Sequence, residues 1–129
     1  MKPPTRAPFY AAMYHGLCET ARARGYALAI HGTVTSDLDL IAVPWTDEAC
    51  SAEELRAALM DHINACDYEQ SLVRFGLKPE EAAQIAARSA ADKTEKPHGR
   101  IAWNLYLDNG CKVDLSVMPR RSAETRSDT

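Results

Sequence analysis

The stretch Ile101-Ala-Trp-Asn-Leu-Tyr-Leu-Asp-Asn-Gly-Cys-Lys-Val-Asp-Leu-Ser-Val117 predicts a β-hairpin, and the hairpin decides the fold. Apolar and polar or small residues alternate on both sides of Asp108-Asn109-Gly110, which is a typical turn sequence. Period-two alternation indicates strands with one buried and one open face. We therefore expect two adjacent antiparallel strands at this end of the chain.

Two turn lengths are possible, and only one of them keeps a single face apolar. A two-residue turn, 109–110, would pair Leu105 with Asp114. A three-residue turn, 108–110, with Gly110 in the left-handed region, pairs Leu105 with Val113 instead. The second register also pairs Leu107 with Cys111, Trp103 with Leu115 and Asn104 with Asp114, and puts Ala102, Lys112 and Ser116 on the polar face. We predict the second register.

The preceding residues change periodicity several times. Apolar residues at helical spacing predict a first helix from about Pro8 to Arg24. Two short strands follow at Tyr26–Ile30 and Asp37–Val43, the second ended by Pro44. A capping box at Ser51 and Glu54 opens a second helix with the apolar stripe Leu55, Leu59, His62, Ile63 and Cys66, and Pro79-Glu80-Glu81 opens a third that runs to about Ala91.

These elements predict an α/β (α+β) fold: a small mixed sheet of about four strands, with helices packed on one side, in the order α-β-β-α-α-β-β. At 129 residues the chain fits a single domain, 1–129, in which 1–8 and 121–129 are expected to be flexible ends. We expect three acidic side chains to converge on the open face of the sheet.

Composition excludes several classes of protein. A net charge of −3 gives no general attraction to nucleic acid or anionic membrane. No stretch approaches the roughly 20 apolar residues of a membrane span, and no apolar run follows the N-terminus as in a signal peptide. The four cysteines are scattered without zinc-site spacing, so we expect reduced thiols, no membrane association and a cytoplasmic location.

Asp37 and Asp39 interrupt an apolar run two residues apart, so on a strand they project from the same face. Neighbouring carboxylates repel one another, and a hard cation such as Mg²⁺ relieves that repulsion with the oxygen ligands it prefers. Asp114 is a third acid in an apolar run, Val113–Val117. The alternative is that all three simply face solvent at strand ends or edges.

The elements His31-Gly32-Thr33, Asp37-Leu-Asp39 and Asp114 together resemble the nucleotidyltransferase superfamily of the DNA polymerase beta type. The segments SDLDLIAVPW and KPHGR…DLSVMPR also resemble small, mostly uncharacterised bacterial and phage members of this fold, over roughly Tyr26 to Arg121. The resemblance implies that Asp37, Asp39 and Asp114 are catalytic and bind Mg²⁺ (or Mn²⁺). It also implies that Gly32 and Thr33, in place of a Gly-Ser element, and Ser36 bind phosphate.

The chain differs from the superfamily in two respects. Only residues 33–36 separate Gly32 from Asp37, whereas the superfamily has a longer connection that includes part of a phosphate-binding helix. Thr33 also replaces the usual serine. Both differences concern triphosphate binding more than metal binding.

Cationic and aromatic residues supply further candidates. Lys96, His98 and Arg100 precede a predicted strand and would give a phosphate its counter-charge, unless they are merely solvated loop residues. Other residues carry similar pairs of interpretations: Trp45 stacks on a base or covers the core, Trp103 is core, Arg120 and Arg121 extend the basic rim or are solvated, and His31 touches a phosphate or is only hydrogen-bonded.

The leading functional prediction is a minimal Mg²⁺-dependent nucleotidyltransferase that moves a nucleoside monophosphate from a nucleoside triphosphate to an unidentified hydroxyl acceptor. The alternative is a catalytically degenerate binding or regulatory protein of the same fold, with a protein partner in a toxin–antitoxin or phage–host setting. A purely structural protein is a third interpretation, but it leaves three acids within apolar strands unexplained.

Overall fold

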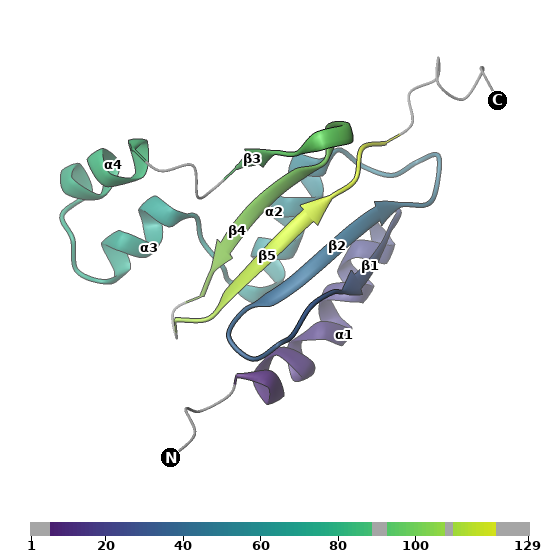
Figure 1. Ribbon diagram of the computed structural model, residues 1–129, viewed down its shortest axis with the longest axis horizontal. Helices are drawn as coiled ribbons and strands as arrows, with labels where there is room; N and C mark the ends of the chain where they lie inside the picture. Colours follow the sequence, from purple (N-terminus) through teal and green to yellow (C-terminus); the bar gives the residue numbers. More distant parts are fainter. Residues whose placement is uncertain (1–5, 89–92, 108–109, 121–129) are drawn as a thin grey trace.

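The computed structural model describes residues 6–88, 93–107 and 110–120. In these residues a mixed sheet has the strand order β1-β2-β5-β4-β3 (Figure 1). The strands are β1 (Tyr26–Ile30), β2 (Leu38–Pro44), β3 (Thr94–Glu95), β4 (Ile101–Tyr106) and β5 (Lys112–Val117). The helices are α1 (Ala7–Ala23), α2 (Ala52–Ile63), α3 (Tyr68–Arg74), α4 (Pro79–Ala87) and the 3₁₀ turn η1 (Pro97–Gly99). The predicted fold class is confirmed.

The β4–β5 hairpin has the register that the polar alternation predicts. Leu105 pairs with Val113, and Asn104 pairs with Asp114. The Leu107 amide donates to the Cys111 carbonyl at 3.0 Å, and Gly110 has the left-handed φ of +79°. The rest of the predicted turn, 108–109, lies outside the described residues.

Two hairpins are joined through the middle of the sheet. β1 pairs antiparallel with β2, β4 pairs antiparallel with β5, and β2 pairs parallel with β5. The sheet contains one strand more than the expected four, because β3 adds a two-residue edge beside β4. The parallel contact between β2 and β5 joins segments far apart in the sequence.

One face of the sheet is apolar and is covered by helices. Leu38 and Leu40 of β2, Leu115 of β5 and Leu105 of β4 are fully buried. Leu17, Leu55 and Leu59 are the fully buried leucines of α1 and α2, the helices that lie behind the sheet in Figure 1. Because strand residues alternate between faces, the acids beside these leucines must project from the opposite, uncovered face.

The helices follow local signals, with some corrections at their ends. The predicted capping box of α2 is confirmed. The helix ends at Ile63 because Asn64 has a left-handed backbone conformation. Cys66 therefore lies beyond the helix, where its backbone forms an isolated β-bridge with Tyr106. His62, expected in the apolar stripe, is exposed. α1 takes in residues 7 and 8, which were expected in the flexible N-terminal end, and residues 121–129 lie outside the described residues.

The C-terminal helices depart further from the prediction. α3 was not predicted; it begins at the Asp67 cap, whose carboxylate accepts from the Gln70 amide at 2.8 Å. α4 ends at Ala87 rather than near Ala91, and residues 89–91 lie outside the described residues. α3 and α4 pack on each other, and α3 contacts β4. In the described ranges, no helix has both the length and the apolar character needed to cross a membrane.

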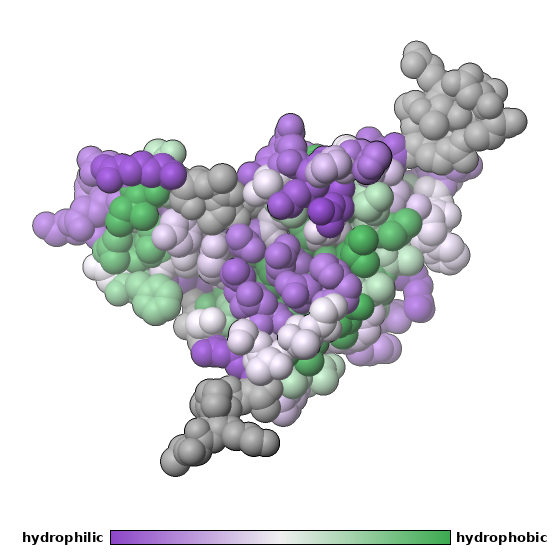
Figure 2. All heavy atoms as spheres, viewed as in Figure 1, coloured by the Kyte–Doolittle hydropathy of each residue, from purple (hydrophilic) through white to green (hydrophobic). Residues whose placement is uncertain are grey.

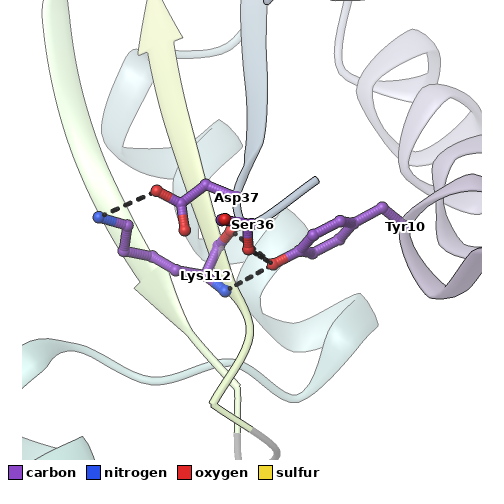
Figure 3. A network of polar contacts seen from close by, with 4 residues as sticks. All are labelled: Tyr10, Ser36, Asp37 and Lys112. Carbon is purple, nitrogen blue, oxygen red and sulfur yellow. Dashed lines mark hydrogen bonds and ion pairs between the residues drawn. The ribbon is translucent and has the colours of Figure 1, made fainter. Parts of the chain in front are cut away.

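A buried tyrosine ties α1 to the open end of the sheet. The Tyr10 hydroxyl donates to the Ser36 carbonyl at 2.7 Å and accepts from the Lys112 amide at 3.1 Å (Figure 3). The Tyr10 side chain is fully buried. One hydroxyl therefore fixes the turn before β2 against the first residue of β5.

We predict that Tyr10→Phe lowers the free energy of unfolding by about 1–3 kcal/mol, because a backbone donor and a backbone acceptor lose their partner together. Urea denaturation measures the loss. Tyr26→Phe is the matched control, since Tyr26 is equally buried and its hydroxyl donates to one carbonyl, that of Cys50, at 2.6 Å. A loss for Tyr10→Phe no larger than that for Tyr26→Phe would contradict the role of the Tyr10 hydroxyl in holding the turn before β2 against β5.

Candidate functional site

The parallel register of β2 and β5 brings two of the predicted acids together. Asp39 of β2 is the direct register partner of Asp114 of β5, and Asp114 in turn pairs with Asn104 of β4. Neighbouring strands lie about 4.8 Å apart, so the two carboxylates lie side by side on the uncovered face. Figure 2 shows hydrophilic residues gathered over the middle of this face.

Asp39 is in an unfavourable environment for a charged carboxylate. Burial is the first cause that raises the pKa of Asp39 above its ordinary value, and the negative charge of Asp114 is the second. Asp37 raises this pKa further, while His31 and Lys112 act in the opposite direction. Two adjacent, partly desolvated carboxylates make this row of the sheet a place where a cation would be stabilised.

Asp37 is the residue before β2. Because Leu38 pairs with Val113 in the parallel register, Asp37 lies beside Lys112. The Lys112 ammonium lies 3.5 Å from the Asp37 carboxylate, and both side chains are partly exposed (Figure 3). The third predicted acid therefore belongs to the same face, but its charge is already matched by a lysine.

A hollow of about 290 Å³ lies on the β4 side of the acids. Its lining includes the predicted cations Lys96 and Arg100 together with Asp114. The Arg100 guanidinium donates to the Ser116 hydroxyl at 3.4 Å, which holds it over β5. Thr94, Asn104, Ser116 and His31 also line the hollow. Two cations and a carboxylate thus share one polar recess.

The predicted phosphate-binding loop approaches the acids at Asp39. Gly32 has a φ of +73°, and a Cβ added there would lie 3.2 Å from Asp39 Oδ2. Thr33 and Ser36 are exposed, and the Ser36 carbonyl is the acceptor for Tyr10. Gly32 therefore lies against the acidic row, whereas neither Thr33 nor Ser36 lines the hollow.

Of the remaining candidates in the described residues, Trp103 lines the hollow, and the others do not. His98 is exposed, lies in η1 with a φ of +66° and does not line the hollow. Trp103 is buried as predicted, whereas Trp45 is 64% exposed and does not cover the core. The Arg120 side chain donates to the Ala49 carbonyl at 3.1 Å, and Arg121 lies outside the described residues.

The donor set fits a hard divalent cation, since Asp37, Asp39 and Asp114 offer only carboxylate oxygens. The register and the raised pKa of Asp39 both indicate concentrated negative charge. Across residues 6–88, 93–107 and 110–120, however, no three His, Cys, Asp or Glu side chains are gathered closely enough to hold a metal ion. Asp37 is paired with Lys112 in this arrangement.

No family model, curated protein or solved structure matches this chain. The resemblance to the nucleotidyltransferase superfamily therefore stays a prediction, and the geometry of the described residues has to support any functional proposal.

Sequence reasoning missed the roles of Lys112 and Tyr10. The alternation places Lys112 on the polar face, but nothing in the sequence separates a paired lysine from a solvated one. Tyr10 is indistinguishable from the other apolar positions of α1 until the partners of its hydroxyl are known.

We predict that Asp39→Asn raises the melting temperature at pH 7. A raised pKa means that the folded state binds the Asp39 proton more tightly than the unfolded state, so stability falls as the pH rises through the raised pKa. The gain should shrink as the pH falls and vanish below about 4, the ordinary pKa of an aspartate, because Asp39 is then protonated in both states. Thermal melts of the wild type and of Asp39→Asn between pH 7 and pH 4 test this prediction. An equal or lower melting temperature for the variant at pH 7 would contradict the raised pKa of Asp39.

We predict that Gly32→Ala costs about 1–2 kcal/mol through its left-handed backbone and also raises the pKa of Asp39, because the methyl group displaces water from that carboxylate. NMR titration of the Asp39 side chain measures the second effect. Gly76→Ala is the control: Gly76 has a φ of +107° with nothing within 4 Å of an added Cβ. It should lose stability and leave the Asp39 titration unchanged.

Proposed function

We propose that this chain is a minimal Mg²⁺-dependent nucleotidyltransferase that transfers a nucleoside monophosphate from a nucleoside triphosphate to a hydroxyl acceptor. The observation that carries the proposal is the β2–β5 register, which sets Asp39 beside Asp114 with Asp37 two residues away on the same face. Asp39 and Asp114 offer carboxylate oxygens of the kind that Mg²⁺ and Mn²⁺ prefer, and Asp37 would join them on leaving Lys112. Such an ion, when bound, would neutralise triphosphate charge.

In the proposed reaction the acceptor oxygen attacks the α-phosphorus, the bond from that phosphorus to the bridging oxygen breaks, and pyrophosphate leaves. Asp114 lies next to both the acidic row and the hollow, so it is the residue we assign to receive the hydroxyl proton. Asp37 and Asp39 are assigned to metal binding. The proton and the leaving group are thereby both accounted for.

The cations of the hollow are assigned to the phosphates. Lys96 and Arg100 face Asp114 across a recess, and a guanidinium gives phosphate oxygens two parallel donors. Gly32 supports the site by leaving room for the Asp39 carboxylate. Thr33, Ser36 and His98 are assigned to phosphate binding from the sequence alone. The four cysteines, all of which lie in the described residues, are thiols and not disulfides, which fits the cytoplasmic location that we propose.

The ion pair between Lys112 and Asp37 favours a second candidate, a catalytically inactive binding or regulatory protein of this fold. A resident lysine compensates one carboxylate without a metal ion. In that case the acidic face would be retained as a polar surface for a protein partner, and neither metal nor triphosphate would be required.

We predict that the purified chain with Mg²⁺ or Mn²⁺ releases pyrophosphate from at least one of the four nucleoside triphosphates and labels an acceptor. The acceptors to be tested are an RNA oligonucleotide, a tRNA and a mixed protein fraction. Asp37→Asn, Asp39→Asn and Asp114→Asn should each lower the rate about 10²–10³-fold, the effect of losing several kcal/mol of charge stabilisation. α-Labelled triphosphates measure the transfer.

Asp61→Asn is the matched control, since Asp61 is an exposed acid on α2 away from the acidic face, and it should keep the wild-type rate. Arg100→Met should raise the KM for triphosphate while turnover continues. The absence of transfer with every triphosphate, together with a melting temperature that does not respond to Mn²⁺, would overturn the proposal and favour the inactive candidate.

A further inference from the structure

Lys112 is attached to the acidic face at a fixed point. Its amide donates to the Tyr10 hydroxyl at 3.1 Å, and its carbonyl lies 3.3 Å from the same hydroxyl, whose one hydrogen has its shorter contact, 2.7 Å, with the Ser36 carbonyl. Tyr10 also holds the Ser36 carbonyl, which belongs to the residue before Asp37 (Figure 3). The two ends of the ion pair are thus positioned by one buried side chain.

The Lys112 side chain projects from the same face as the acids. Lys112 precedes Asp114 by two residues on β5. Asp37 likewise precedes Asp39 by two residues, just before the start of the neighbouring strand β2. Its ammonium lies 3.5 Å from Asp37 Oδ2, and its charge also acts on Asp39. The lysine is therefore a single positive charge within the row formed by Asp37, Asp39 and Asp114.

A divalent ion held by those acids would lie close to this ammonium. The repulsion between charges of +2 and +1 is twice that between two single charges at the same distance. The flexible four-carbon stem of lysine allows the ammonium to leave while the backbone stays in place. Asp37 Oδ2 faces the Lys112 ammonium, so an ion that takes this oxygen competes with the lysine for it.

We infer that Lys112 is the resident counter-cation of the acidic site and that a divalent ion binds there only by displacing it from Asp37; this inference rests on the proposed function. The ion pair compensates the charge of Asp37 in the metal-free site, and it weakens metal binding. The chain thereby controls, through one lysine, how readily its own site is loaded.

The test is a titration with Mn²⁺ alone, followed by the loss of the free-ion electron paramagnetic resonance signal. Lys112→Met should bind Mn²⁺ at least about tenfold more tightly than the wild type, a difference of about 1.4 kcal/mol. Lys112→Arg, which keeps the charge, should stay near the wild type. The backbone contacts with Tyr10 do not involve the exchanged side chain, and circular dichroism checks that each variant is folded.

Lys93→Met is the matched control, because Lys93 also pairs with a carboxylate, that of Glu53, at 3.8 Å and the net charge changes equally. It should leave Mn²⁺ affinity unchanged. The double variant Lys112→Met, Asp37→Asn should lose the gain of the single one. Tight binding by Lys112→Met with none detected for the wild type also supports the inference.

The outcomes separate this inference from the proposed function. Equal or weaker Mn²⁺ binding by Lys112→Met, with clear binding by the wild type, overturns the displacement and leaves the metal site intact. An equal gain in Lys93→Met reduces the effect to net charge and also overturns it. No binding by any folded variant removes both the inference and the metal site.

Discussion

The parallel pairing of β2 with β5 is the constraint on which the rest of the structure depends. The β1–β2 and β4–β5 pairs join elements close in sequence, whereas β2 and β5 are separated by three helices and two strands. A slip of one residue along this pair would set Asp39 beside a leucine or valine and reverse which residues face the helices. The buried leucines on one face therefore hold the acids in register on the other.

The pairing of β2 with β5 also explains how two carboxylates that repel each other can lie side by side in a stable sheet. Asp39 and Asp114 meet because Leu40 and Leu115 pair and are fully buried one position along. Apolar burial on the covered face offsets the desolvation and the carboxylate repulsion that together raise the pKa of Asp39. Lys112, fixed by Tyr10, offsets part of that repulsion from within the row. Stability and concentrated negative charge are thus supplied by opposite faces of the same strands.

Local patterning sufficed for much of the fold but not for all of it. Strand β1, the capping box of α2 and the β4–β5 register were predictable because short-range alternation and turn chemistry determine them. α3 and β3 were missed because their seven and two residues are too short for a periodic signal. The Lys112–Asp37 contact depends on a pairing across distant segments, which one sequence does not reveal.

The short connection between β1 and β2 constrains where a phosphate could be held. The residues between Ile30 and Leu38 turn the chain back into an antiparallel pair, and the described connection contains no helix whose N-terminus could receive an anion. Gly32 instead lies against the Asp39 carboxylate. Lys96 and Arg100 lie around the hollow next to Asp114. A nucleotide that binds here would therefore place its phosphates toward β3 and β4, with side chains rather than a helix end supplying the counter-charge.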